Sequence, residues 1–370
     1  MTITNSKRIK TLEALRAIAF ICVFLSHTGF SCFGSIGYFG VSIFFVLTGF
    51  VSIVSQYGKD IVPSLKNNWN YMVSKIKKLY PLHIVTMICM SVFCIFGSEK
   101  EPLIKTIVKF ILNIFLVQEW FPLKQRDLNE VSWFLCVLLI AYLIFPWILK
   151  KIKKDHTVRK AKLHIVIFLC AELLVALLGK QLSVIDLSNS VVIDGCLVEW
   201  FVSRFPLFRL FEVAIGYNLG YIYLQDRNRN IANATLKEIA AIIFALICII
   251  ISTSSLSNTI VDSGILNENA WWNIVIIYTI PSMLLIYLFA YGKGRLSNLL
   301  VNKFTMYIAS ISAYGFLIHY VIFRYITYLF YHVVPSGISY KYCAYFKLTV
   351  GFILTIICCE VWKRIQKHIK

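Results

Sequence analysis

Long apolar runs separated by short basic segments make up most of this chain. Runs of this kind predict helices that cross a lipid bilayer. Ten of them occupy residues 11–30, 38–56, 80–96, 131–149, 163–178, 206–224, 239–251, 271–291, 304–330 and 342–361. An eleventh apolar stretch, residues 102–120, is interrupted by Lys105, Lys109, Asn113 and Gln118, so its pattern alone does not decide whether it crosses.

The basic segments decide how residues 102–120 are placed. If that stretch crosses, the strongly basic residues 150–162 fall outside the cell, against the tendency of Lys and Arg to stay cytoplasmic. If it lies in the interface or re-enters, all strong basic segments face one side. The loops around Asp186, Asp194, Asp262 and Glu268 then face the other side. The sequence therefore predicts an all-α membrane bundle with about ten transmembrane helices, one interfacial or re-entrant segment and both termini in the cytoplasm.

Composition supports a membrane protein and argues against nucleic-acid binding and metal binding. Of the 370 residues, 59% are hydrophobic and only 15% are charged, and the mean hydropathy is +0.74. The net charge of +19 does not indicate nucleic-acid binding, because Lys and Arg gather in short clusters that suit cytoplasmic loops and anionic lipids. The 11 Cys lie almost entirely in apolar runs without zinc-type spacing, so no metal is expected. We expect one transmembrane domain over residues 1–370 and no separate C-terminal soluble domain.

The first apolar run carries three polar residues that share one helical face. Arg16 and His27 are eleven positions apart, which brings them within roughly 20° of three full helical turns. Glu13 joins the same face three positions before Arg16. The Arg16 and His27 positions are about 16 Å apart along the axis, roughly half the hydrocarbon core. Charges inside a span are costly, so this face is expected to line a cavity rather than lipid.

Other polar residues fall at two depths under the predicted topology. Lys75, Lys78 and Tyr80 accompany Glu13 and Arg16 near the cytoplasm, whereas Trp133, Arg209, Glu212 and His319 belong with His27 in the outer half. A cationic inner mouth suits a phosphate-bearing ligand, and an imidazole can act as proton acceptor or nucleophile. Structural roles stay open for each residue, including ion pairs between Glu13 and Arg16 and between Arg209 and Glu212, and a packing role for His319.

Taken together, these motifs resemble the acyltransferase 3 family of polytopic membrane O-acyltransferases over most of the chain. The matching motifs are the Arg16–His27 pair, residues 40–50 (GVSIFFVLTGF), 75–81 (KIKKLYP), 133–135 (WFL) with Tyr142 and Pro146, 209–212 (RLFE) with Gly216 and Gly220, and 312–319 (SAYGFLIH). Five positions depart from the family pattern. Ser42 replaces a frequent Asp, Lys75 and Lys78 replace arginines, and Cys136 and Val137 stand where a large subgroup has an acidic residue. These departures favour a surface-glycan branch of the family.

The resemblance implies transfer of an acetyl group from cytoplasmic acetyl-CoA to a sugar hydroxyl of a cell-surface or lipid-linked polysaccharide. His27, Arg16 and Glu13 would form the catalytic group, with His27 acting as general base or transient acetyl carrier. Arg16, Lys75, Lys78 and Tyr80 would bind the coenzyme, and Trp133, Arg209, Glu212, Ser312 and His319 would contact or support the acceptor. The implied location is the bacterial inner membrane, where the partners would be membrane lipids, the glycan acceptor and polysaccharide-assembly proteins.

Two other functions remain compatible with intramembrane charges. A flippase or exporter of a lipid-linked glycan would also use polar residues inside spans, although transporters often show internal repeats and broken helices. No repeat is evident in this sequence. A structural subunit of a polysaccharide-assembly complex would use the polar face of the first run to contact a partner helix.

Overall fold

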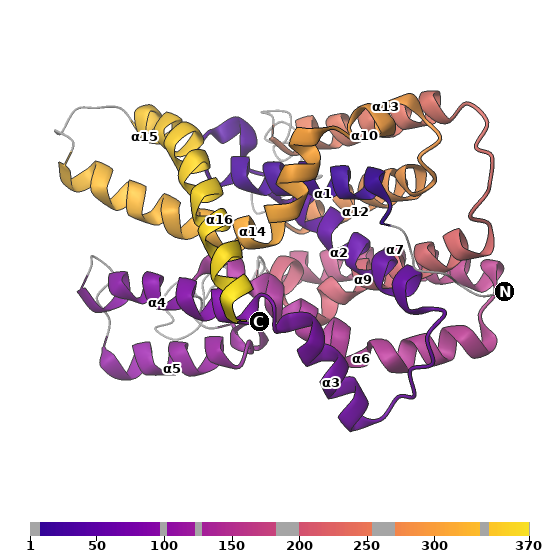
Figure 1. Cartoon of the computed structure of the whole chain (residues 1–370), viewed down its shortest axis with the longest axis horizontal. Helices are drawn as coiled ribbons and strands as arrows, with labels where there is room; N and C mark the ends of the chain where they lie inside the picture. Colours follow the sequence, from indigo (N-terminus) through magenta and orange to yellow (C-terminus); the bar gives the residue numbers. More distant parts are fainter. Residues whose placement is uncertain are drawn as a thin grey trace.

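The computed structural model describes residues 8–96, 102–122, 128–182, 200–253, 271–333 and 340–369, and within them the chain forms helices and no strand. The predicted all-α fold is therefore confirmed for this part of the chain (Figure 1). The α-helices are α1 (Lys10–Ser26), α2 (Ile36–Gln56), α3 (Leu65–Ile76), α4 (Tyr80–Phe96), α5 (Leu103–Ile114), α6 (Trp133–Asp155), α7 (Val158–Leu182), α9 (Pro206–Gln225), α10 (Ala234–Thr253), α12 (Trp271–Tyr291), α13 (Arg295–Leu299), α14 (Lys303–Val333), α15 (Tyr340–Phe346) and α16 (Phe352–Ile369). The loop residues Asp186, Asp194, Asp262 and Glu268 lie outside the described residues.

Helices occupy all ten predicted apolar runs. Within the described residues, six helical segments are long and apolar enough to cross a bilayer: Ser31–Gln56, Glu130–Asp155, Val158–Gly179, Ala234–Ser252, Lys303–Val333 and Lys341–His368. The pair α3 and α4, bent by 60° at their junction, adds a seventh if it counts as one broken span. The chain is thus a multi-pass membrane protein. The count of ten spans and the cytoplasmic placement of the termini stay predictions.

The basic segment at residues 66–78, which lies between two of the predicted spans, is mostly the helix α3. Ser64 caps it by accepting a hydrogen bond from the Asn67 backbone N–H. Asn68, Met72 and Ile76 recur every four residues and are its buried positions. The Asn68 amide donates to the Leu143 carbonyl of α6 over 2.8 Å. Amphipathic spacing therefore outweighs the high Lys content and packs this segment against the bundle.

Helix α5 covers most of the apolar stretch 102–120, and it does not reach across a bilayer. Its 12 residues extend about 18 Å, against a hydrocarbon core of about 30 Å. Thr106, Lys109 and Asn113 form its buried face, and its apolar residues are exposed. Its end meets the start of α4, because the Tyr80 hydroxyl donates to the Ile114 carbonyl over 2.8 Å. The two helices lie side by side in Figure 1. These features support the prediction that this segment is interfacial or re-entrant.

The closest helix packing in the core joins α2 and α9. A Cβ atom added to Gly49 would collide with the Val213 carbonyl oxygen, and one added to Gly216 would collide with the Val46 carbonyl oxygen. The two backbones therefore touch where only glycine fits, a common way to join helices inside a membrane. This contact fixes α9 against α2, and α1 packs on α2 as well.

Segments near the two ends of the chain meet at one end of the bundle. Arg8 lines the same cavity as Lys78 and Tyr314. Gln366, near the C-terminus, donates to the Lys78 carbonyl over 2.6 Å and accepts a hydrogen bond from the Tyr314 hydroxyl over 2.7 Å. Residues near the two ends of the described chain therefore lie close together, and the side of the membrane on which the termini lie stays a prediction.

Candidate active site

Two cavities lie along α1, one beside each end of its polar face. The larger, of about 630 Å³, is lined by residues of α1, α2, α14 and the α3–α4 segment, including Arg8, Arg16, Lys75 and Lys78. We call it the cationic cavity. The smaller, of about 260 Å³, is lined by Val23, Ser26, His27, Gly34, Gly37, Tyr38, Val41, Glu130, Val131, Trp133, Ser203, Arg204 and Phe316. We call it the histidine cavity. The polar face of α1 thus lines cavities, as predicted.

The cationic cavity gathers four basic side chains around one carboxylate. Arg16 Nη1 lies 3.3 Å from Glu13 Oε2, and 38% of the Arg16 side chain remains exposed. The Lys75 ammonium lies 5.1 Å from the centre of the Tyr71 ring, which orients it by a cation–π contact. The surplus of positive charge makes this cavity suitable for phosphate groups. Its volume lies within the usual range for small-molecule sites, about 300–1,000 Å³.

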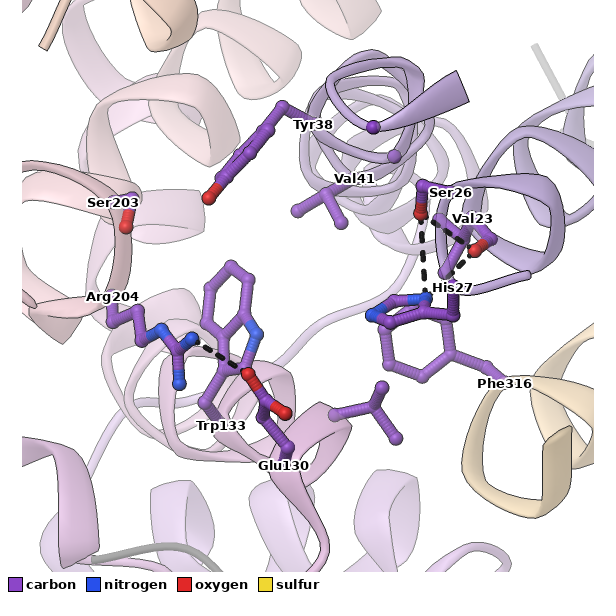
Figure 2. Close-up of a pocket in the computed structure, with 13 residues that line it drawn as sticks. Val23, Ser26, His27, Tyr38, Val41, Glu130, Trp133, Ser203, Arg204 and Phe316 are labelled. Carbon is purple, nitrogen blue, oxygen red and sulfur yellow. Dashed lines mark hydrogen bonds and ion pairs between the residues drawn. The ribbon is translucent and has the colours of Figure 1, made fainter. Parts of the chain in front are cut away.

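In the histidine cavity, His27 is held by its Nδ1 atom. This nitrogen lies 2.8 Å from the Val23 carbonyl oxygen and 3.3 Å from His319 Nε2. His319 Nδ1 lies 2.9 Å from the Gly315 carbonyl oxygen, so it carries the proton and leaves Nε2 as an acceptor. Two acceptors therefore face His27 Nδ1 and assign the proton to it. His27 Nε2 then has a lone pair, and this atom points into the cavity (Figure 2).

The wall opposite His27 carries an ion pair (Figure 2). Arg204 Nη2 lies 3.0 Å from Glu130 Oε1, and the other Glu130 oxygen accepts a hydrogen bond from the Tyr320 hydroxyl. Arg204 ends a π-helical turn, Trp200–Arg204, in which the Phe205 backbone N–H donates to the Trp200 carbonyl over 2.8 Å. Such turns insert one extra residue and are frequent at functional sites.

A layer of phenylalanines separates the two cavities. Ser312 and Ala313 line the cationic cavity, and Phe316, one turn further along α14, lines the histidine cavity. The Phe316 ring packs against Phe44 and Phe134, with ring centroids 5.9 and 5.0 Å apart. The two cavities are therefore close together but separated by aromatic side chains.

The predicted site residues divide into four groups. Glu13, Arg16, Lys75, Lys78 and Ser312 line the cationic cavity, and His27 and Trp133 line the histidine cavity. His319 contacts His27 from behind, which confirms the prediction that the two histidines share one depth. Arg209, Glu212 and Tyr80 line neither cavity. The Tyr80 hydroxyl turns instead to α5, so its position gives no support to the predicted role in coenzyme binding.

Arg209 and Glu212 form a fully buried ion pair behind the histidine cavity. Arg209 Nη2 lies 2.9 Å from Glu212 Oε2, and the Thr279 hydroxyl donates to Glu212 Oε1 over 3.2 Å. The Arg209 guanidinium lies 5.8 Å from the centre of the Trp133 ring. The pair thus supports Trp133 from behind and does not itself face the cavity.

The sequence analysis missed several residues of the histidine cavity, above all Glu130 and Arg204. Each precedes an apolar run directly or by one residue, so each could be taken for an ordinary charge at a membrane boundary. The two are 74 positions apart, and no local spacing connects them. A charge within two residues of the start of a span, on the same predicted side as His27, is the signal that could have found them.

Comparisons with known proteins agree with this site. The acyltransferase-domain family profile matches residues 9–361. The chain is 30% identical over 165 residues to acyltransferase MdmB of Streptomyces mycarofaciens, covering 40% of this chain and 41% of that protein. It is 28% identical over 120 residues to peptidoglycan O-acetyltransferase OatA of Listeria monocytogenes, covering 32% of this chain and 18% of that protein. The matched part is therefore less than half of either relative.

No solved structure matches the chain significantly. The family match covers nearly the whole sequence, and it includes α1 with its polar face and both cavities. The chain therefore belongs to the acyltransferase 3 family, and it is a multi-pass membrane protein.

Proposed function

We propose that this protein transfers an acetyl group from acetyl-CoA to a sugar hydroxyl of a cell-surface or lipid-linked polysaccharide. The observation that carries the proposal is the pairing of two cavities along α1. One offers four cations, and the other offers an imidazole nitrogen with a lone pair. A donor with phosphates and an acceptor with a hydroxyl need these two kinds of site. The name of OatA, a peptidoglycan O-acetyltransferase, supports a glycan acceptor.

The coenzyme would bind in the cationic cavity. Four basic side chains would contact its phosphates: Arg8, Arg16, Lys75 and Lys78. The pattern of basic segments predicts that this cavity lies on the cytoplasmic side, where the coenzyme would enter. Lys75 and Lys78 act there as point charges rather than bidentate forks. The acyl arm would then extend along α1 toward the phenylalanine layer, which has to move aside for the thioester to reach His27.

In the histidine cavity, His27 acts as general base. The acceptor hydroxyl loses its proton to His27 Nε2 while its oxygen attacks the thioester carbonyl carbon. A carbon–oxygen bond forms, the carbon–sulfur bond breaks, and the proton passes from His27 to the departing coenzyme thiolate. The Val23 carbonyl holds the Nδ1 proton and stabilises the imidazolium that forms between these steps. Direct transfer requires both substrates bound together, whereas an acetylated His27 would give ping-pong kinetics.

Substitution of His27 by Gln tests the proposal. General base catalysis contributes about 10²–10⁴-fold, so we expect a loss of at least about 100-fold in acetyl transfer. Mass analysis of surface glycans from cells with the wild-type protein, the variant or no protein measures the O-acetyl content. Glycan export should stay normal in the variant. Normal acetylation of a glycan whose export has stopped would contradict the proposal and favour an exporter.

We further propose the bacterial inner membrane as the location, with lipids and polysaccharide-assembly proteins as neighbours. Sealed membrane fractions separated by density, probed for the protein, test the location. Recovery in another membrane fraction would contradict it.

A further inference from the structure

We propose that Glu130 and Arg204 form the acceptor-binding pair that selects which hydroxyl of a sugar ring is acetylated. This inference rests on the proposed function and adds the two residues that position the acceptor. Both side chains line the histidine cavity on the wall that faces His27 (Figure 2).

The pair is built into the fold from three directions. Glu130 begins the short turn Glu130–Ser132 that leads into α6, Arg204 ends the π-helical turn before α9, and Tyr320 belongs to α14. The Trp200 indole N–H donates to the Glu119 carbonyl over 3.0 Å and so anchors the turn that carries Arg204. Both Glu130 oxygens are engaged, one by Arg204 and one by Tyr320. The carboxylate is therefore held in a fixed orientation.

Exposure argues against a purely stabilising role. The Glu130 side chain is 44% exposed and that of Arg204 is 17% exposed. Ion pairs with this much exposure contribute little to stability, typically about 0–1 kcal/mol. The exposed part of the pair belongs to a cavity wall rather than to the packed core. A ligand in the cavity would meet a carboxylate and a guanidinium side by side.

This combination matches neighbouring hydroxyl groups on a sugar ring. A carboxylate accepts hydrogen bonds, a guanidinium donates them from a rigid fork, and each sugar hydroxyl can do both. The aromatic rings of Trp133 and Tyr38 line the same cavity and offer flat apolar surfaces to the ring. The volume of about 260 Å³ is below the usual 300–1,000 Å³ of drug-sized sites, so it suits a single sugar unit.

The positions of the two walls explain selectivity. If Glu130 and Arg204 bind two hydroxyls of the ring, a third hydroxyl is directed to His27 Nε2 across the cavity. Only a hydroxyl with the correct position relative to the two bound hydroxyls reaches His27. The pair therefore controls both the affinity for the acceptor and the position of the acetyl group.

Steady-state kinetics of the full-length protein in native membranes test this inference. Radiolabelled acetyl-CoA is the donor, and polysaccharide purified from cells that lack the protein is the acceptor. Arg204→Lys keeps the charge and loses the fork, and Glu130→Gln keeps the shape and loses the charge. Each should raise the acceptor KM about tenfold or more, leave the acetyl-CoA KM within about twofold, and broaden the set of acetylated positions seen by NMR.

Two further variants make the result specific. Tyr320→Phe removes the hydroxyl that holds Glu130 and should raise the acceptor KM by a smaller factor. Asp60→Asn breaks the surface ion pair with Lys153. Neither residue lines either cavity, so this variant should change neither KM.

The measured KM values decide whether Glu130 and Arg204 bind the acceptor. An unchanged acceptor KM in Arg204→Lys and Glu130→Gln would overturn the inference, and so would an equal rise in both KM values, which indicates a structural role. If the wild-type protein labels no polysaccharide, the proposed function itself fails. If the wild type labels it and the two variants behave like Asp60→Asn, only the acceptor-binding pair fails.

Discussion

At the scale of single residues, the state of His27 depends on its neighbours rather than on the side chain alone. Val23 and His319 both present acceptors to Nδ1, and this fixes the tautomer with a lone pair on Nε2. His319 is fully buried and is itself oriented by the Gly315 carbonyl. A pair of histidines thus prepares one nitrogen for proton transfer. In the proposed mechanism, His319 is a positioning residue, because it would act through His27.

Substitution of His319 by Leu should lower kcat moderately. The change removes one hydrogen-bond acceptor from His27, an effect of about 0.5–1.5 kcal/mol, which corresponds to a loss of roughly twofold to thirteenfold in kcat. The loss in kcat should be smaller than in His27→Gln, and the acetyl-CoA KM should stay the same. Acetyl-transfer assays in purified membranes measure kcat and the acetyl-CoA KM of both variants and of the wild type.

His332→Leu serves as the matched control, because His332 makes the same contact to the carbonyl four residues earlier but lies exposed near the end of α14. It should leave kcat unchanged. A loss in His319→Leu as large as that in His27→Gln would contradict the positioning role.

At the scale of helices, periodicity predicts more of the fold than of the site. The ten apolar runs all form helices, and the weak run at residues 102–120 forms the short α5 with a polar buried face. Helix α3 was not predicted because no apolar run covers it, whereas burial of Asn68, Met72 and Ile76 decides its structure. Motif spacing found Arg16 and His27 because Arg16 lies in α1 and His27 is the C-cap residue of the same helix. Glu130 and Arg204 come from distant segments, so only tertiary packing brings them together.

The α2–α9 contact provides a stability prediction at this scale. Gly216→Ala places a methyl group against the Val46 carbonyl, so the two helices must separate. Overpacking of this kind costs about 1–3 kcal/mol, and thermal unfolding in detergent should show a lower Tm.

Gly34→Ala is the control for that substitution. A Cβ at Gly34 would meet only the Ser31 carbonyl oxygen, at an ordinary 3.5 Å, and the Gly34 φ of −51° suits alanine. We expect little change in its Tm. Equal Tm values for the two variants would contradict the close contact between α2 and α9.

At the scale of the whole molecule, the proposed reaction requires one acyl group to pass from the cationic cavity to the histidine cavity. The cationic cavity and the histidine cavity lie along the same helix, α1, and the phenylalanine layer of Phe44, Phe134 and Phe316 separates them. Ser312 and Phe316 belong to opposite cavities although they are only about 6 Å apart along α14. In the proposed reaction, these aromatic side chains would have to move aside to connect the two cavities.

Acetyl transfer across sealed membrane vesicles shows whether the acyl group passes from one face of the membrane to the other. Inverted vesicles are loaded with the surface polysaccharide, and radiolabelled acetyl-CoA is added outside, where the predicted cytoplasmic face is exposed. Right-side-out vesicles receive both substrates on the outside. We expect labelled polysaccharide only in the inverted vesicles with the wild-type protein, and no label in inverted vesicles that contain His27→Gln. Labelling of equal extent in both orientations, or labelling that persists in His27→Gln, would contradict the proposed reaction.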